Sequence, residues 1–270
     1  MVEQKPQYYI QSLQSALDVL EAFSLKEKNL GISEISRKLD MNKSRVHRIL
    51  VTLENSGYVT RNDETQKYRL GLKLFQLGHI VEEQMEVRHF AFPVMQKLAL
   101  ETQETVNLNV IHDGKRMSVE KIESPHEIRQ AVELGKTLPL HSGAPGKVLL
   151  ANLPENRINE ILHQAKLKVM GPRTITDPDQ LIKELKKVRE LGYSVSFEET
   201  YLGAVSIAAP VRDFSGKVIA AISITGPVSR FSKENIERFI PLAIQAGRVI
   251  SQALGYSDRN ENNITPGKPE

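Results

Sequence analysis

The sequence predicts an α+β protein: an N-terminal winged helix-turn-helix, a linker helix, and an antiparallel sheet with helices packed on it. Residues 32–71 read as two short helices followed by a charged hairpin. A helical pattern then continues to about residue 102. Beyond it, segments with the two-residue period of strands are separated by segments with the helical period, which indicates an antiparallel sheet with packed helices.

Composition limits the number of domains, the compartment and the kinds of site that the sequence can support. The chain has 270 residues, 40% of them apolar, which is enough for two compact domains. It has no apolar run of about eighteen residues and no signal-peptide pattern at its start, so we expect a cytoplasmic protein without a membrane segment. The absence of cysteine excludes disulfides, thiolate nucleophiles and cysteine-ligated metals. A net charge of +3 is too small to imply a nucleic-acid partner by itself.

The first three helices are expected to pack against one another. The first begins near Ser12 and places on one face Leu13, Ala16, Leu17, Leu20 and Phe23. Ser33 is the expected N-cap of a second helix of barely two turns, and Asn42 caps the third. This order is that of a helix-turn-helix.

The third helix is the candidate recognition helix, because no carboxylate lies between Asn42 and Leu50. Its buried face is predicted to hold Val46, Ile49, Leu50 and Leu53. The outward candidates are Ser44, Arg45 and Arg48 for base edges and Lys43 for phosphate. His47 is a further DNA-binding candidate, although a solvent-facing or packing histidine remains the alternative.

A wing is expected after Gly57, the C′ residue of the third helix. Residues 58–61 and 67–70 alternate as strands, with a turn between them. Arg61, Lys67 and Arg69 would contact DNA backbone or the minor groove, and solubility of an edge hairpin is the alternative.

The domain boundaries follow from these patterns. Residues 1–71 form the expected DNA-binding domain and residues 72–91 a linker helix that could carry part of a dimer contact. A break near Pro93 predicts a new helix from Phe92, the start of the C-terminal domain at residues 92–256. Residues 257–270 are polar and expected to be a disordered tail.

The C-terminal domain reads as strands and helices around one secure hairpin, in which the Asp113–Gly114 turn joins two alternating segments. The expected strands are residues 105–111, 117–122, 128–134, 193–197, 205–211 and 218–225, and the expected helices are residues 145–152, 155–165, 177–191 and 233–255.

Four separated segments resemble the isocitrate lyase regulator (IclR) family of transcriptional regulators. In order, they read ISEISRKLDMNKSRVHRILVTLENSGYVTR, PLHSGAPGKVLLANLP, RELGYSVSFEETYLGAVSIAAPV and AAISITGPVSRF. The resemblance covers about residues 12–255. It implies a GAF-like effector domain, binding to double-stranded operator DNA, a homodimer or dimer of dimers, and control by a small metabolite.

The resemblance also implies an effector site. Matching positions are Leu138, Ala144, Pro145, Ser196, Ala204, Ser206, Ser223 and Thr225. Ser196 stands where glyoxylate- and pyruvate-sensing members have an acidic residue, so this chain departs there and the resemblance does not identify its effector. The residues alone place the Ser223 and Thr225 hydroxyls on one strand face, where a polar ligand, the backbone or solvent would partner them. The hydroxyl-rich, non-aromatic site suggests an organic or sugar acid.

Enzyme interpretations fail on spacing. Residues 143–147 lack the spacing of a P-loop, with Val148 where Ser or Thr is required. Glu198 and Glu199 are adjacent and are expected to border the site or cap a loop. The seven histidines show no two-His helical pair typical of zinc. We therefore expect neither enzyme activity nor a cofactor, and nothing in the sequence motivates a metal site. The expected function is that of a ligand-controlled transcriptional regulator, with repression favoured, although the sequence does not distinguish repression from activation. The alternative is a metabolite sensor or small-acid enzyme whose N-terminal domain docks protein.

Overall fold

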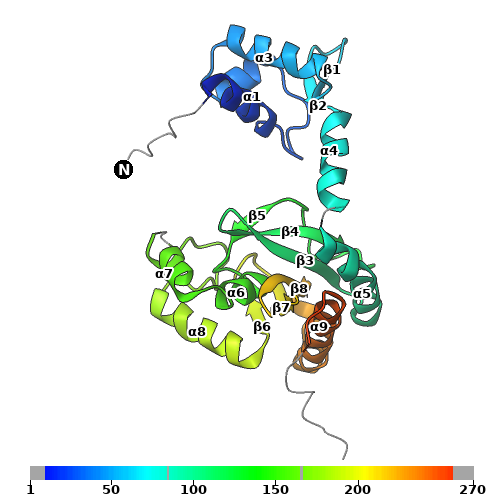
Figure 1. Cartoon of the computed structure of the whole chain (residues 1–270), viewed down its shortest axis with the longest axis vertical. Coiled ribbons are helices and arrows are strands. Elements are labelled where there is room, and N and C mark those ends of the chain that lie inside the picture. The colour runs from blue at the N-terminus through cyan, green and yellow to red at the C-terminus, as the bar shows by residue number, and fades with distance from the viewer. Residues whose placement is uncertain (1–9, 84, 165–166, 258–270) are drawn as a thin grey trace, which may run out of the picture. The chain divides into compact units, whose positions relative to one another are not determined.

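The computed structural model describes residues 10–83, 85–164 and 167–257 (Figure 1). The chain divides into two compact units, residues 1–84 and 85–270, each with its own hydrophobic core. In the described residues, no helix is both long enough and apolar enough to cross a membrane. The polar tail predicted for residues 257–270 lies, from residue 258 on, outside the described residues.

The N-terminal unit is the predicted winged helix-turn-helix. Its elements are α1 (Gln11–Glu21), α2 (Ile32–Lys38), α3 (Lys43–Asn55), β1 (Val59–Arg61), β2 (Tyr68–Leu70) and α4 (Leu72–Glu83). Antiparallel pairing of β1 with β2 forms the wing, and an isolated antiparallel bridge joins Leu30 to Tyr68 of β2. Val46 and Leu50 of α3 are fully buried, so the predicted inner face of the recognition helix is confirmed.

The helix ends in this unit are set by neighbouring capping residues, and one predicted cap was wrong. Asn42 caps α3 as predicted, its side chain accepting from the Ser44 amide at 2.9 Å. At the other end, Gly57 has φ +79° and the Tyr58 amide donates to the Leu53 carbonyl at 2.8 Å, which is a Schellman closure. The N-cap of α2 is Gly31, not Ser33, because the Glu34 carboxylate accepts from the Gly31 amide at 2.6 Å.

The buried face of α1 also differs from the prediction. Ser15 and Val19 are buried in α1, whereas Leu13 is 57% exposed and Leu17 is 44% exposed. The apolar stripe of this helix is wider than the area that α2 and α3 cover. Its outer edge therefore remains at the surface of the unit.

The C-terminal unit contains a six-stranded antiparallel sheet in the order β5-β4-β3-β8-β7-β6. The strands are β3 (Thr105–His112), β4 (Lys115–Ile122), β5 (Thr137–Pro139), β6 (Ser194–Phe197), β7 (Ala204–Arg212) and β8 (Val218–Pro227). The helices are α5 (Glu86–Thr102), α6 (Ala144–Ala151), α7 (Glu155–Gln164), α8 (Pro178–Leu191) and α9 (Lys233–Ala253), with a short 3-10 turn, η1 (Val228–Arg230).

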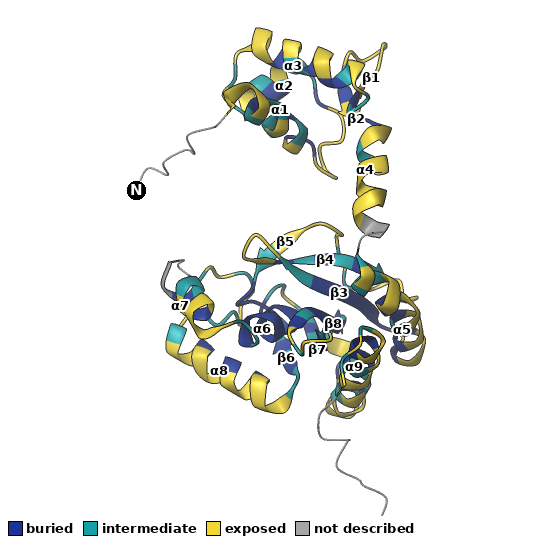
Figure 2. Ribbon diagram, viewed as in Figure 1, coloured by how far each residue is buried: buried dark blue, intermediate teal, exposed yellow. Residues whose placement is uncertain are grey.

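The central strands of this sheet, β3, β7 and β8, are largely buried (Figure 2). The two faces of the sheet bury different kinds of residue. Toward α5 and α9 point apolar side chains such as Leu108, Ile222 and Ile224, which form the main core. Ala208 and Ala221, on the other face, pack with α6 and α8 in a second core. The register pairs Asn107 with Ser223 on that second face, so polar side chains lie beside it.

Three expectations for this part of the chain were wrong. The helix expected to start at Phe92 starts at Glu86 and continues through Pro93, because burial of Ala91 and Met95 holds the turns on either side of the proline. The chain instead breaks between α4 and α5, so residues 72–91 are not one helix. Residues 128–134 form no strand, and the edge partner of β4 is β5.

Candidate functional site

The outward face of α3 carries the predicted DNA-binding side chains. Lys43, Ser44, His47 and Arg48 are all exposed, as expected from the position of the buried stripe. The cationic groups of Lys43 and Arg48 make no hydrogen bond or ion pair to any residue that the structure describes. A short helix that presents free cations and polar side chains suits the DNA major groove.

Arg45 behaves differently from its neighbours on α3. Its guanidinium donates to the buried Ser15 hydroxyl at 2.6 Å and to the Gln11 carbonyl at 3.3 Å. The side chain thus joins α3 to α1, although it lies on the exposed side of α3.

The three wing cations have partners within the wing or on α2. Arg61 donates to Gln66 and lies over the Tyr68 ring, 5.8 Å from its centroid, while Arg69 donates to the Thr60 hydroxyl at 3.1 Å. Lys67 pairs with Glu34 at 2.9 Å. That contact and the Gly31 amide hold the pKa of Glu34 below its ordinary value, with the amide as the larger cause. The wing is therefore tied to α2.

A cavity of about 60 Å³ lies in the C-terminal unit, at the face of the sheet that carries Asn107 and Ser223. This is several times the space that one water molecule needs. The side chains predicted for the effector site that line it are Leu138, Pro145, Ser196, Ala204, Ser206, Ser223 and Thr225. Ala144 does not line the cavity, but its amide donates to the Ser196 hydroxyl at 3.1 Å and to the Ser206 hydroxyl at 3.3 Å. The structure thus brings the eight positions together.

Sequence reasoning missed much of the cavity wall. The other lining residues are Asn107, Asn109, Arg116, Ser118, Gln130, Ala131, Val132, Glu133, Lys136, Thr200, Tyr201 and Val205. Asn107 and Asn109 are the polar residues that alternate with apolar ones in the strand expected at residues 105–111. The pairing of β3 with β8, which places Asn107 beside Ser223, is the signal that could have assigned them to the site. Residues 130–136 belong to a loop, for which the sequence offers no period.

Arg116 is the most unusual wall residue, because it is a buried cation. Its Nη1 lies 3.4 Å from Asn109 Oδ1 and its Nη2 lies 3.4 Å from the Thr200 hydroxyl, while its Nε makes no hydrogen bond. Desolvation lowers the pKa of Arg116 to about 10, and Tyr201 opposes that shift. The group remains charged at neutral pH.

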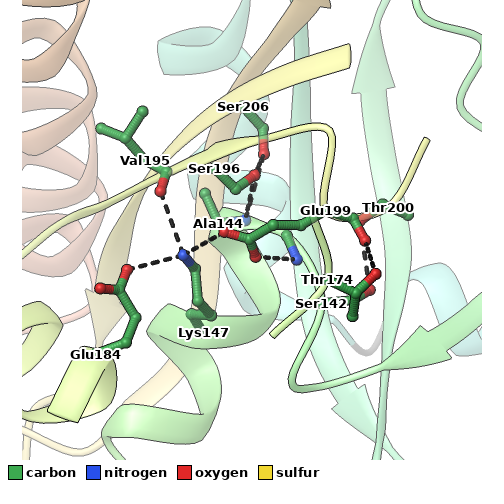
Figure 3. Close-up of polar contacts among 11 residues, drawn as sticks. Ser142, Ala144, Lys147, Thr174, Glu184, Val195, Ser196, Glu199, Thr200 and Ser206 are labelled. Atoms are coloured by element: carbon green, nitrogen blue, oxygen red, sulfur yellow. Dashed lines mark hydrogen bonds and ion pairs between the residues drawn. The ribbon is translucent and has the colours of Figure 1, made fainter. Parts of the chain in front are cut away.

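A buried charged network lies next to the cavity (Figure 3). Lys147, 1% exposed, donates to Glu199 at 2.7 Å and to Glu184 of α8 at 2.8 Å. Glu199 also accepts from the Gly143 amide at 3.1 Å, at the start of α6. Burial raises the pKa of Glu199, and Lys147 opposes that rise. The lysine of the rejected P-loop pattern is thus a structural cation.

The network fixes the loop that carries Thr200. Glu199 is held from both sides, since its backbone carbonyl accepts from the Thr174 hydroxyl at 2.6 Å. Glu198 accepts from the Gly203 amide at 2.8 Å, which confirms its predicted loop-capping role. A Cβ at Gly143 would lie 2.7 Å from the Thr200 hydroxyl, so this glycine allows α6 and the loop to approach.

Comparison with known proteins identifies the family of both units. Residues 12–63 match the IclR helix-turn-helix domain, and residues 79–252 match the bacterial transcriptional regulator IclR C-terminal domain. The chain is 36% identical to the HTH-type transcriptional regulator KdgR of Escherichia coli, over 92% of this chain and 94% of that protein. It is 33% identical to the E. coli HTH-type transcriptional repressor AllR, over 91% of this chain and 90% of that protein.

One similar solved structure contains a bound small molecule. The crystal structure of an IclR homolog from Microbacterium hydrocarbonoxydans, complexed with 4-hydroxybenzoate, superposes with a TM-score of 0.81 at 26% identity. The match covers 90% of this chain and 99% of that one. Since the matches span both units, the chain belongs to the IclR family of DNA-binding transcriptional regulators.

Proposed function

We propose that this protein is a sequence-specific repressor whose binding to operator DNA is controlled by a small organic or sugar acid in the C-terminal cavity. The observation that carries the proposal is the pairing of two features in one chain: free cations on the outer face of α3 and a buried polar cavity in the second unit. A named repressor among the relatives supports the direction of control, and the 4-hydroxybenzoate complex of another supports an acid. Such a regulator works where the DNA is, in the cytoplasm.

A homodimer or dimer of dimers is part of the proposal. Exposed apolar side chains on α1 and α4, among them Leu13, Leu72 and Phe75, would be covered by a second copy. Two recognition helices in a symmetric dimer bind half-sites about 34 Å apart, or a multiple of that spacing. Control then requires that the effector bind one arrangement of the dimer better than the other.

An Arg48→Ala variant tests the DNA-binding assignment. With an operator selected from random duplexes, we expect affinity to fall about 10- to 100-fold, because a base or phosphate contact is lost. Wild-type affinity should also fall steeply as salt rises, through release of counterions from the phosphates. Fluorescence anisotropy measures both effects.

Lys187→Ala, which removes an exposed cation from α8, is the matched control and should leave operator affinity unchanged. Arg48→Ala protein that binds the operator as tightly as wild type would contradict the assignment of α3 as the recognition helix.

A further inference from the structure

The charge of the cavity wall is unbalanced. Its charged residues are Arg116, Lys136 and Glu133, two cations and one carboxylate. Lys136 pairs with Glu133 at 2.9 Å at the edge of the cavity. Arg116 has no carboxylate within ion-pairing distance among the described residues. A buried cation without a counter-ion is costly, so an anion that enters the cavity would be bound strongly.

The hydrogen-bonding groups of Arg116 also point to an anion. Its two contacts, to Asn109 and Thr200, are long at 3.4 Å, and its Nε has no acceptor. A guanidinium offers parallel N–H donors that match the two oxygens of a carboxylate. Gly146 of α6 leaves room for this side chain, because a Cβ there would lie 3.3 Å from Arg116 Cδ. The side chain therefore lies against α6.

A second unpartnered atom in the same wall is a hydrogen-bond acceptor, which requires a donor from the ligand. Asn107 is buried, and its Oδ1 accepts no hydrogen bond. A buried carboxamide oxygen needs a donor, which a carboxylate cannot supply and a hydroxyl can. The hydroxyls of Ser118 and Ser223, which bond to Asn109 at 3.0 and 3.3 Å, extend the same polar wall.

We propose that Arg116 anchors the carboxylate of the effector and that Asn107 accepts from one of its hydroxyls, so that the ligand class is a small aliphatic hydroxy acid. This inference rests on the proposed function and specifies it further. It assigns the specificity of the cavity to two residues of β3 and β4.

The test uses full-length protein and three matched sets of compounds. The hydroxy acids are glycerate, threonate and gluconate, the neutral polyols are glycerol, threitol and glucitol, and the plain acids are propionate, butyrate and hexanoate. Thermal shift ranks them, and titration calorimetry measures the affinity of the best. We expect hydroxy acids to bind wild type, polyols not to bind, and plain acids to bind more weakly.

Two substitutions of Arg116 separate charge from geometry. Arg116→Gln should weaken hydroxy-acid binding by about 10- to 100-fold, and Arg116→Lys by less, because it keeps the charge but not the fork. Without ligand, Arg116→Gln should melt at the same temperature as wild type or higher, because an unpaired buried charge is gone. Arg157→Gln, an exposed arginine of α7, is the matched control and should match wild type.

The proposal is overturned if Arg116→Gln binds the hydroxy acid as tightly as wild type, if polyols bind equally well, or if no acid of the panel binds wild type at millimolar concentration. A lower melting temperature of ligand-free Arg116→Gln together with unchanged acid binding would make Arg116 a structural residue. If the acid binds through Arg116 but leaves operator affinity unchanged, the inference survives and the proposed effector control fails.

Discussion

At the scale of single residues, Arg45 shows how one side chain can serve the fold of a recognition helix. It was predicted to read base edges, and the structure directs its guanidinium to Ser15 and Gln11 of α1. Because Ser15 is buried, the contact is partly shielded from water and stabilises the packing of α1 on α3. We infer that Arg45 affects DNA binding indirectly, by fixing the position of α3, and that it does not contact the bases.

A double-mutant cycle tests this inference. Arg45→Ala and Ser15→Ala should each lower the free energy of unfolding, with a coupling energy of about 1 kcal/mol, because they remove the same hydrogen bond. Urea denaturation measures it. Additive effects, with operator binding lost only in Arg45→Ala, would restore Arg45 as a base reader.

Single residues also mark the limit of prediction from the sequence. The hydroxyls of Ser223 and Thr225 were found from strand parity and resemblance, and both line the cavity. Arg116 was missed because its position on a hairpin strand reads as an ordinary surface cation. Only the pairing of β4 with β3 and the packing of α6 make it buried.

At the scale of elements, the contact between the wing and α2 depends on one carboxylate. Glu34 accepts from the Gly31 amide and pairs with Lys67, so its pKa lies below the ordinary value of 4.5. A lowered folded-state pKa contributes stability above the unfolded-state pKa, and this contribution is lost as pH falls through the folded-state value.

Glu34→Gln should therefore be less stable than wild type at neutral pH, and the difference should shrink as the pH falls below about 4.5. Thermal unfolding of both proteins across this range, followed by circular dichroism, provides the measurement. A difference that stays constant with pH would show that the ionisation of Glu34 does not stabilise the wing.

Elements with strong local signals were predicted well, and those decided by distant contacts were not. Asn42, Gly57 and Gly192 set the ends of α3 and α8 through local capping. Pro93 was expected to end a helix, but the core between α5 and α9 outweighs the hydrogen bond that a proline removes. Residues 128–134 have a strand-like composition without a neighbouring strand to pair with.

At the scale of the whole molecule, the proposed function requires that ligand binding in the cavity change the affinity for DNA. Ser223 and Thr225 lie on β8, in the unit that does not carry α3. A Ser223→Ala, Thr225→Ala double variant should bind the operator as wild type does and lose the response to the hydroxy acid, because both hydroxyls line the cavity and neither belongs to the unit that carries α3. Anisotropy with and without the acid measures this.

If the double variant responds to the acid as wild type does, the effector binds at another site. Weaker operator binding without ligand would instead show that the two hydroxyls support the DNA-competent form itself.

The sheet register has a consequence for how such a protein could acquire a new signal. Along β3 and β8, the odd-numbered positions 107, 109, 223 and 225 form the wall of the cavity, whereas their even-numbered neighbours form the core with α5 and α9. Substitutions at odd positions can thus alter the chemistry that is sensed while leaving the packing of the protein intact. Along these two strands, alternate residues therefore determine ligand specificity and the stability of the fold.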